Sequence, residues 1–136
     1  MAIENFSYVV ETKKSFKDAL IAVRKQAESR KWGVLGDYDF SEILSSKGFP
    51  QAEQAKSLDL CSPSHANQVM AAEKLAALCM PCSVLVFTDQ GKTKIAAVKP
   101  GVMLPLLFPH AKGKLGALPQ EIDAQLKDIL DAAAGS

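Results

Sequence analysis

Hydrophobic and polar positions alternate with two different periods along this chain, and each period predicts a different kind of element. Residues 15–30 carry apolar side chains three and four positions apart, which predicts a helix with one buried face. Ser15 stands where an N-cap is expected, and Asp18 stands at the capping-box position. Residues 7–12 are instead rich in β-branched and aromatic side chains, which predicts a strand. The apolar residues of the helix are Phe16, Ala19, Leu20, Val23 and Ala27.

The same two patterns predict the remaining elements. Ser62 and Pro63 are expected to begin one helix. Serine is a good N-cap, and the backbone N–H that proline lacks has no helical partner at the first helical position. Asp89-Gln90-Gly91 separates two apolar runs and predicts a hairpin between them. The further strands are expected at residues 32–36, 55–61, 82–88 and 93–98, and the further helices at residues 39–47, 63–78 and 119–133.

A late hairpin makes the sheet at least partly antiparallel. This order of elements favours an α+β fold over a doubly wound parallel fold. We expect a mainly antiparallel sheet of about five strands packed against two to three helices. The length of 136 residues corresponds to a single domain over residues 1–136. A chain of this length with 48% apolar residues can form a core without stabilising disulfides or metal ions.

Charge and hydropathy narrow the partners and the compartment. The net charge of +1 argues against nucleic acid, which requires a concentrated basic face, and against an anionic membrane surface. Residues 1–6 show no secretion signal, and no apolar run approaches the ~20 residues that span a bilayer. We therefore expect a cytoplasmic protein. Three cysteines in a reducing compartment are better interpreted as core residues, metal ligands or reactive thiols than as a disulfide framework.

Two of the three cysteines form the motif Cys79-Met80-Pro81-Cys82. This spacing is used by redox dithiols and metal sites, but here the motif follows a helical run, whose negative end disfavours a thiolate. Residues three apart on a strand face opposite sides, so the two sulfurs meet only if Met80-Pro81 turns. The motif is thus compatible with two packed thiols, with a metal or redox pair, or with one reactive thiol.

Cys61 and His65 form a second candidate group. Cys61 ends a strand just before the helix that Pro63 begins, where the helix terminus favours a thiolate or an anion. His65 falls in the first turn of that helix, so the two residues could form a nucleophile or two metal ligands. They could equally be a strand end beside a solvated histidine. Together with Cys79 and Cys82 they would match a thiolate-rich Zn or Cu(I) site.

The segment Val102–Phe108 is entirely apolar if its proline is counted. Proline makes it a poor central strand, and seven such residues cannot all stay exposed without consequence. The segment could cap the sheet, line a ligand pocket or bury against a second copy. The last helix, over residues 119–133, has a similar apolar face. We expect a homodimer that forms through one of these two surfaces.

Three pieces of the sequence occur in a characteristic order and spacing: Tyr8–Thr12 followed by Ser15-Phe16, Leu60-Cys61-Ser62-Pro63 before an alanine-bearing helix, and Met80-Pro81-Cys82 before an apolar strand and a hairpin. In this order they resemble the Domain of Unknown Function 302 family of bacteria and archaea. The resemblance covers about residues 8–98, and residues 105–136 form a C-terminal extension outside it. It implies a compact α+β domain with a mainly antiparallel sheet, a homodimer, and no particular reaction. The family pattern carries over to Cys61, Pro63, Pro81 and Cys82, whereas Cys79 departs from it.

The sequence therefore supports three hypotheses about function. The first is a non-enzymatic homodimer that binds a small ligand or a metal near Cys61, His65 and Cys82. The second is a thiol redox or sulfur-handling protein that uses Cys79 with Cys82, or Cys61. The third is an interaction protein whose cysteines pack in the core. Whether the protein is an enzyme stays open at this stage.

Overall fold

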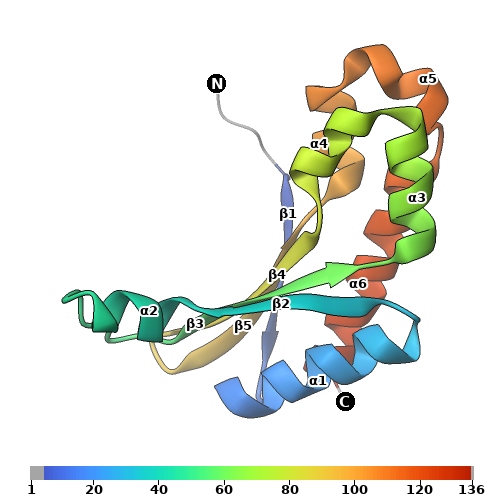
Figure 1. The fold of residues 1–136 in the computed structure, drawn as a ribbon. Coiled ribbons are helices and arrows are strands. Elements are labelled where there is room, and N and C mark those ends of the chain that lie inside the picture. Colours follow the sequence, from blue (N-terminus) through green and yellow to red (C-terminus); the bar gives the residue numbers. More distant parts are fainter. Residues whose placement is uncertain (1–4, 136) are drawn as a thin grey trace.

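One antiparallel sheet of five strands, in the order β1-β5-β4-β3-β2, organises the chain (Figure 1). The structure is a computed structural model that describes residues 5–135, so most of the N-terminal segment examined for a secretion signal lies outside it. The predicted α+β fold with an antiparallel sheet is confirmed. The strands are β1 (Ser7–Thr12), β2 (Gly33–Asp39), β3 (Ala55–Cys61), β4 (Cys82–Asp89) and β5 (Lys92–Val98).

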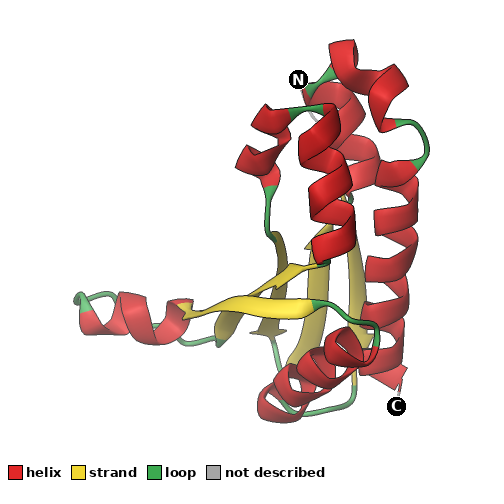
Figure 2. Cartoon of the chain, turned by 45° about the vertical axis from the view of Figure 1, so that its right-hand side comes forward, coloured by secondary structure: helices red, strands yellow, loops and turns green. Residues whose placement is uncertain are grey.

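Helices α1 and α6 lie against one face of this sheet and against each other, while α3, α4 and α5 gather at one end (Figures 1 and 2). Within the described residues, no helix is both long enough and apolar enough to cross a membrane. The helices are α1 (Phe16–Ser29), α2 (Phe40–Ser46), α3 (Pro63–Ala72), the 3₁₀ helix η1 (Lys74–Cys79), α4 (Pro100–Leu107), the 3₁₀ helix η2 (Pro109–Ala111), α5 (Lys112–Leu115) and α6 (Leu118–Gly135).

The core lies between the sheet and helices α1 and α6. Every second residue of the central strands is buried there, because side chains alternate between the two faces of a strand. Helix α6 is part of this core, and its end is tied to β1, where Thr12 Oγ1 donates to the carbonyl of Ala134 at 2.8 Å. Its apolar face is thus covered by its own chain. The buried residues include Val23, Leu58, Leu60, Val84, Val86, Ile95, Leu126, Ile129 and Leu130.

The predicted N-cap at Ser15 is confirmed, and the helix after Asp39 begins with the same kind of cap. Ser15 Oγ accepts a hydrogen bond from the backbone N–H of Asp18, and Asp39 Oδ1 accepts one from that of Glu42. The helix expected over residues 63–78 is wrong in its second half. It ends at Ala72, because Glu73 adopts an extended backbone, and the chain resumes as the 3₁₀ helix η1.

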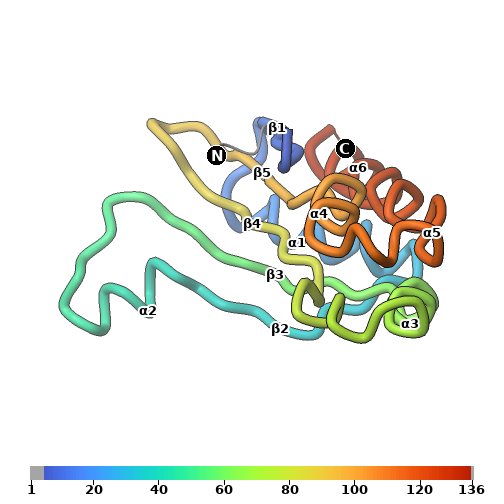
Figure 3. Tube along the Cα trace, turned by 90° about the horizontal axis from the view of Figure 1, so that it is seen from above, coloured from blue at the N-terminus to red at the C-terminus, as the bar shows by residue number. Residues whose placement is uncertain are grey.

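The segment that joins β2 to β3 forms an arm that projects from the rest of the molecule (Figures 1 and 3). The main packing contacts of its helix α2 are with the adjoining strands β2 and β3. None of the seven residues of α2, all of them described, is buried. Gly48 follows the helix with φ of +94°, and Phe49 then donates its backbone N–H to the carbonyl of Leu44 at 3.0 Å. This helix ending, which favours glycine at the position of positive φ, brings Phe49 close to Leu44.

Candidate functional site

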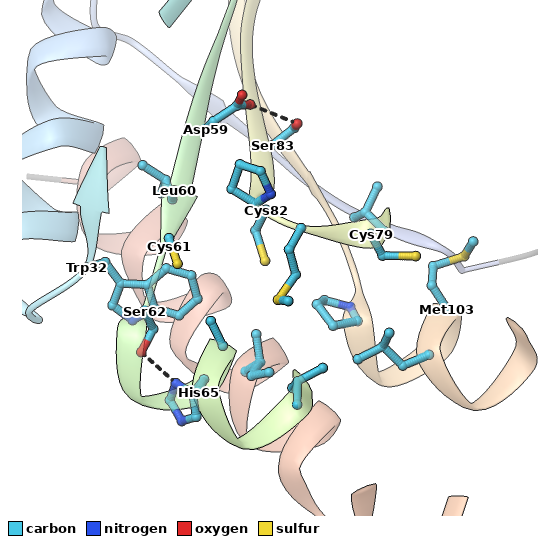
Figure 4. Close-up of a pocket in the computed structure, with 18 of the residues that line it drawn as sticks. Trp32, Asp59, Leu60, Cys61, Ser62, His65, Cys79, Cys82, Ser83 and Met103 are labelled. Atoms are coloured by element: carbon cyan, nitrogen blue, oxygen red, sulfur yellow. Dashed lines mark hydrogen bonds between the residues drawn. The ribbon is translucent and has the colours of Figure 1, made fainter. Parts of the chain in front are cut away.

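A cavity of about 500 Å³ opens at the end of β3, where the sheet meets α3, η1 and the start of α4 (Figure 4). Most of its walls are apolar, and among its described residues the one carboxylate is that of Asp59. Its lining residues come from five separate stretches of the chain, so the cavity exists only in the folded protein. They are Trp32; Asp59, Leu60, Cys61, Ser62, His65, Ala66 and Val69; Leu78, Cys79, Met80, Pro81, Cys82 and Ser83; Val98, Pro100, Met103 and Leu104; and Ile122.

Local sequence explains why the strand ends meet at this place. Strand β3 stops at Cys61 because Ser62 and Pro63 begin α3, with proline in its first turn. Strand β4 starts at Cys82, directly after the cis peptide bond between Met80 and Pro81. Leu60 and Cys82 are register partners in the β3–β4 pair, so the end of one strand lies beside the start of the other. All four candidate residues, Cys61, His65, Cys79 and Cys82, line the cavity as a result.

His65 is held by two neighbours at the cavity wall. Its Nδ1 lies 2.8 Å from Ser62 Oγ, and its ring centroid lies 6.3 Å from that of Trp32. The Trp32 indole in turn donates from Nε1 to Gln125 Oε1 at 2.7 Å, which fixes the ring from behind. Ser62 occupies the predicted N-cap position, but its hydroxyl contacts His65 and makes no cap hydrogen bond to the backbone. His65 therefore pairs with Ser62, whereas the sequence had suggested a pair with Cys61.

The three thiols are free and differ in their exposure. Burial raises the pKa of the Cys82 thiol to about 12, with the charges of Cys61 and Asp123 acting in the same direction. Burial also raises the pKa of Cys61, which is opposite to the effect expected from a helix terminus beside it. Cys79 is exposed, and Figure 4 shows it on the side of Met103, with Cys82 between it and Cys61.

The four candidate residues do not assemble into a metal site. Among residues 5–135, no group of three or more His, Cys, Asp or Glu side chains is arranged so that it could hold a metal ion. The thiolate-rich set of Cys61, His65, Cys79 and Cys82 is therefore not formed in the described part of the chain. What these residues share is the wall of one apolar cavity.

Alkylation rates should follow the burial of the thiols. The thiolate is the reactive form of a cysteine. With a pKa of about 12, only about one ten-thousandth of the Cys82 side chains are thiolate at pH 8. We expect iodoacetamide to modify Cys79 at least 100-fold faster than Cys82 at this pH, and the Cys82 rate to rise about tenfold per pH unit towards pH 12. Peptide mass spectrometry over time measures both rates. Equal alkylation rates for Cys79 and Cys82 in the native protein would contradict the burial of Cys82. As the control, the two cysteines should react at equal rates in denaturant.

Two features of the site were not identified from the sequence. Trp32 is buried in the core, and it also packs beside His65 and forms one wall of the cavity. Met103 and Leu104 belong to the apolar segment Val102–Phe108, which folds as most of α4 and lines the cavity on the side opposite α3. Lining a pocket was one of three roles open to that segment. Its apolar composition was the available signal, but composition alone does not indicate where a segment packs.

Comparisons with known proteins agree with this fold. The sequence model of the family described as "Domain of unknown function DUF302" matches residues 8–133. The match thus extends to residue 133, within α6, beyond the residues 8–98 that the sequence resemblance covered. A crystal structure of an uncharacterized conserved DUF302 protein from Bacillus stearothermophilus superposes with a TM-score of 0.86. It is 24% identical, and the alignment covers 95% of this chain and 98% of that one. No curated protein matches the sequence.

Proposed function

The chain belongs to the DUF302 family, whose description assigns no activity, and we propose that it binds a small, largely apolar and uncharged molecule in the cavity at the end of β3. The proposal rests on one observation, the cavity itself. A volume of about 500 Å³ falls within the range of ~300–1,000 Å³ that is typical of small-molecule sites. Apolar walls with a few polar groups are also typical of such sites.

The polar groups of the cavity favour a neutral ligand. Asp59 accepts a hydrogen bond from Ser83 Oγ at 3.1 Å, and this pair lies on the neighbouring strands β3 and β4, where they border the cavity. A carboxylate there repels an anionic ligand, and no lysine or arginine is among the described lining residues to offset it. Ser62 and His65 offer hydrogen bonds to one polar group of a ligand whose remaining surface is apolar.

Cys61 and Cys82 contribute to this site as protonated, weakly polar side chains. A thiol whose pKa burial has raised behaves as a small apolar group and is a poor nucleophile at neutral pH. The thiol redox hypothesis requires the opposite shift. We therefore assign Cys61, His65 and Cys82 to ligand contact and place Cys79 at the rim of the cavity.

We also propose that the protein acts as a homodimer in the cytoplasm. Three free thiols suit a reducing compartment. Of the two surfaces expected from the sequence to mediate the dimer, α6 is packed on the sheet. In the Val102–Phe108 segment, Leu104 and Phe108 are buried, whereas Leu106 and Leu107 are 46% and 49% exposed and leave this segment as the better candidate for contact with a second copy.

A series of primary alkanols tests ligand binding directly. Trp32 is the only tryptophan of the sequence and lines the cavity, so its fluorescence reports occupancy. From hexanol to decanol we expect saturable binding whose Kd falls roughly fourfold per added methylene, following ~0.8 kcal/mol for each buried CH₂. The affinity should level off once the cavity is filled.

Matched ligands and variants separate this proposal from its rivals. A carboxylate of the same chain length should bind more weakly than the alkanol, because Asp59 repels it. Cys82→Ser should retain alkanol binding within a few-fold, whereas a thiol mechanism would lose its function with that change. A fluorescence signal that fails to saturate for every chain length would refute the proposal. Stoichiometric Zn²⁺ binding that protects the thiols from alkylation would favour the metal hypothesis instead.

A further inference from the structure

Ser62 and His65 form a hydrogen-bonded pair of a nucleophile and a base in the wall of the cavity. The Ser62 hydroxyl lies 2.8 Å from Nδ1 of His65, and in the ring tautomer that carries its proton on Nε2 the hydroxyl donates to Nδ1. Both side chains line the cavity and are half-buried, so a ligand can reach them (Figure 4). A serine within hydrogen-bond reach of an imidazole is the arrangement that activates a hydroxyl for attack on a carbonyl.

The hydroxyl of Ser62 is not engaged in capping the helix that follows it. A serine at the N-cap normally accepts a hydrogen bond from a backbone N–H of the first turn, but Ser62 Oγ makes no such bond to a described residue and contacts His65 instead. The imidazole also packs against Trp32, whose ring centroid lies 6.3 Å away, and this contact orients the base. The start of α3 thus keeps backbone N–H groups without a side-chain cap, at the end of the helix that stabilises negative charge developing on an oxygen.

We propose that the protein is an esterase that hydrolyses neutral esters with an apolar acyl chain in this cavity, an inference that rests on the proposed binding of a neutral, largely apolar molecule. Ser62 Oγ attacks the ester carbonyl and transfers its proton to Nδ1 of His65. The C–O bond to the alcohol breaks, the alcohol leaves with that proton, and the acyl group stays on Ser62. A water molecule then gives a proton to His65 and attacks the acyl carbon. The acid is released, and Ser62 Oγ recovers the proton from His65.

The charge of the cavity suits the substrate and expels the product. A neutral ester fits the apolar walls and offers one carbonyl to Ser62 and His65. Hydrolysis converts this ester into a carboxylate, which Asp59 repels, and no lysine or arginine is among the described lining residues to neutralise it. The buried thiols do not compete for the acyl group, because burial raises the pKa of both Cys61 and Cys82 and makes them poor nucleophiles at neutral pH.

Hydrolysis of p-nitrophenyl esters by the full chain tests the proposal. We expect kcat/KM for the octanoate ester to be at least tenfold higher than for the acetate ester, because each methylene buried in the cavity adds roughly fourfold in affinity until the cavity is filled. Octanol should inhibit by competition, and octanoate should inhibit at least tenfold more weakly, since Asp59 repels the anion. An octyl fluorophosphonate, which loses fluoride when a serine oxygen bonds to its phosphorus, should label Ser62, and peptide mass spectrometry locates the label.

Three variants separate catalysis from binding. Ser62→Ala and His65→Asn should each lower kcat/KM for the octanoate ester at least 100-fold, because a positioned base contributes ~10²–10⁴-fold, while the Kd of octanol should stay within about fivefold. His65→Asn keeps a hydrogen-bond acceptor for Ser62 but cannot take its proton. Ser46→Ala, on the exposed helix α2, is the matched control and should change neither quantity more than twofold. Circular dichroism confirms that each variant is folded.

The outcomes distinguish this inference from the proposed function. Saturable octanol binding without ester hydrolysis would overturn the esterase and leave ligand binding intact. Hydrolysis that persists in both Ser62→Ala and His65→Asn would overturn it as well, and so would an acyl or phosphonyl group found on Cys79 in place of Ser62. The absence of both saturable octanol binding and hydrolysis would refute the proposed function and the esterase together.

Discussion

Replacing Ile129 with alanine is expected to lower the free energy of unfolding by about 3–4 kcal/mol, because the change empties a fully buried position. Ile129 lies in α6 within the cluster that joins this helix to the sheet and to α1. With a total stability of ~5–15 kcal/mol for ordinary proteins, such a loss is a large part of the whole. Chemical denaturation followed by circular dichroism measures it from the shift of the midpoint.

Ile21→Ala is the matched control for this experiment. It removes the same atoms from a side chain that is 55% exposed, so the loss should stay near 0.5 kcal/mol or below. Equal losses for the two variants would contradict the assignment of α6 to the core. A large loss at Ile129 alone would show that α6, which the sequence resemblance treated as an extension, is needed for the stability of the fold.

Replacing Ala66 with phenylalanine is expected to raise the Kd for octanol at least tenfold, because the new ring occupies space that a ligand would fill. Ala66 lines the cavity from the first half of α3 and is half-buried, so the helix accepts a larger side chain there. Each methylene that can no longer be buried costs the ligand about 0.8 kcal/mol. Titration through Trp32 fluorescence measures the change, since phenylalanine adds no interfering signal.

The chain-length series gives this variant an internal control. A smaller cavity should move the alkanol of best affinity to a shorter chain, whereas a misfolded variant would lose all binding. Ala66→Ser leaves the volume almost unchanged and should bind octanol within about threefold of the original protein. An Ala66→Phe protein that is folded and binds octanol normally would mean that the alkanol occupies another site.

Patterns local in the sequence predicted most of the fold. The apolar stripe from Phe16 to Ala27 predicted α1, and the two apolar runs on either side of Asp89–Gly91 predicted the hairpin. The N-cap predicted at Ser15 is confirmed by its hydrogen bond. The apolar Val102–Phe108 segment was harder, because proline argues against a strand without specifying a helix. It forms most of α4, with Pro105 inside the helix. Helix α3 ends early because Glu73 adopts an extended backbone, which helical spacing in the sequence does not reveal.

The candidate site was only partly accessible to the same reasoning. Cys61, His65 and Cys82 could be singled out because they flank a strand end and a helix start. Their environment could not be predicted, because the burial that raises the pKa of the Cys82 thiol comes from distant parts of the chain. The wall residue Ile122 lies far from Trp32 in sequence, and only the packing of α6 brings both to one cavity. The choice among the three roles that the sequence left open for the cysteines therefore depends on tertiary packing, which local sequence does not reveal.

The strand order has a consequence for the synthesis of this protein. Strand β1 is an edge strand whose partner among residues 5–135 is β5, and Ser7 faces Val98 across that pair. At ~5–20 residues per second, the first strand waits several seconds on the ribosome until its partner has been translated. The core-covering helix α6 is made later still. A nascent chain that stalls before residue 98 would therefore expose the apolar side of β3 and β4 to chaperones and proteases, and the full domain would fold only near the end of translation.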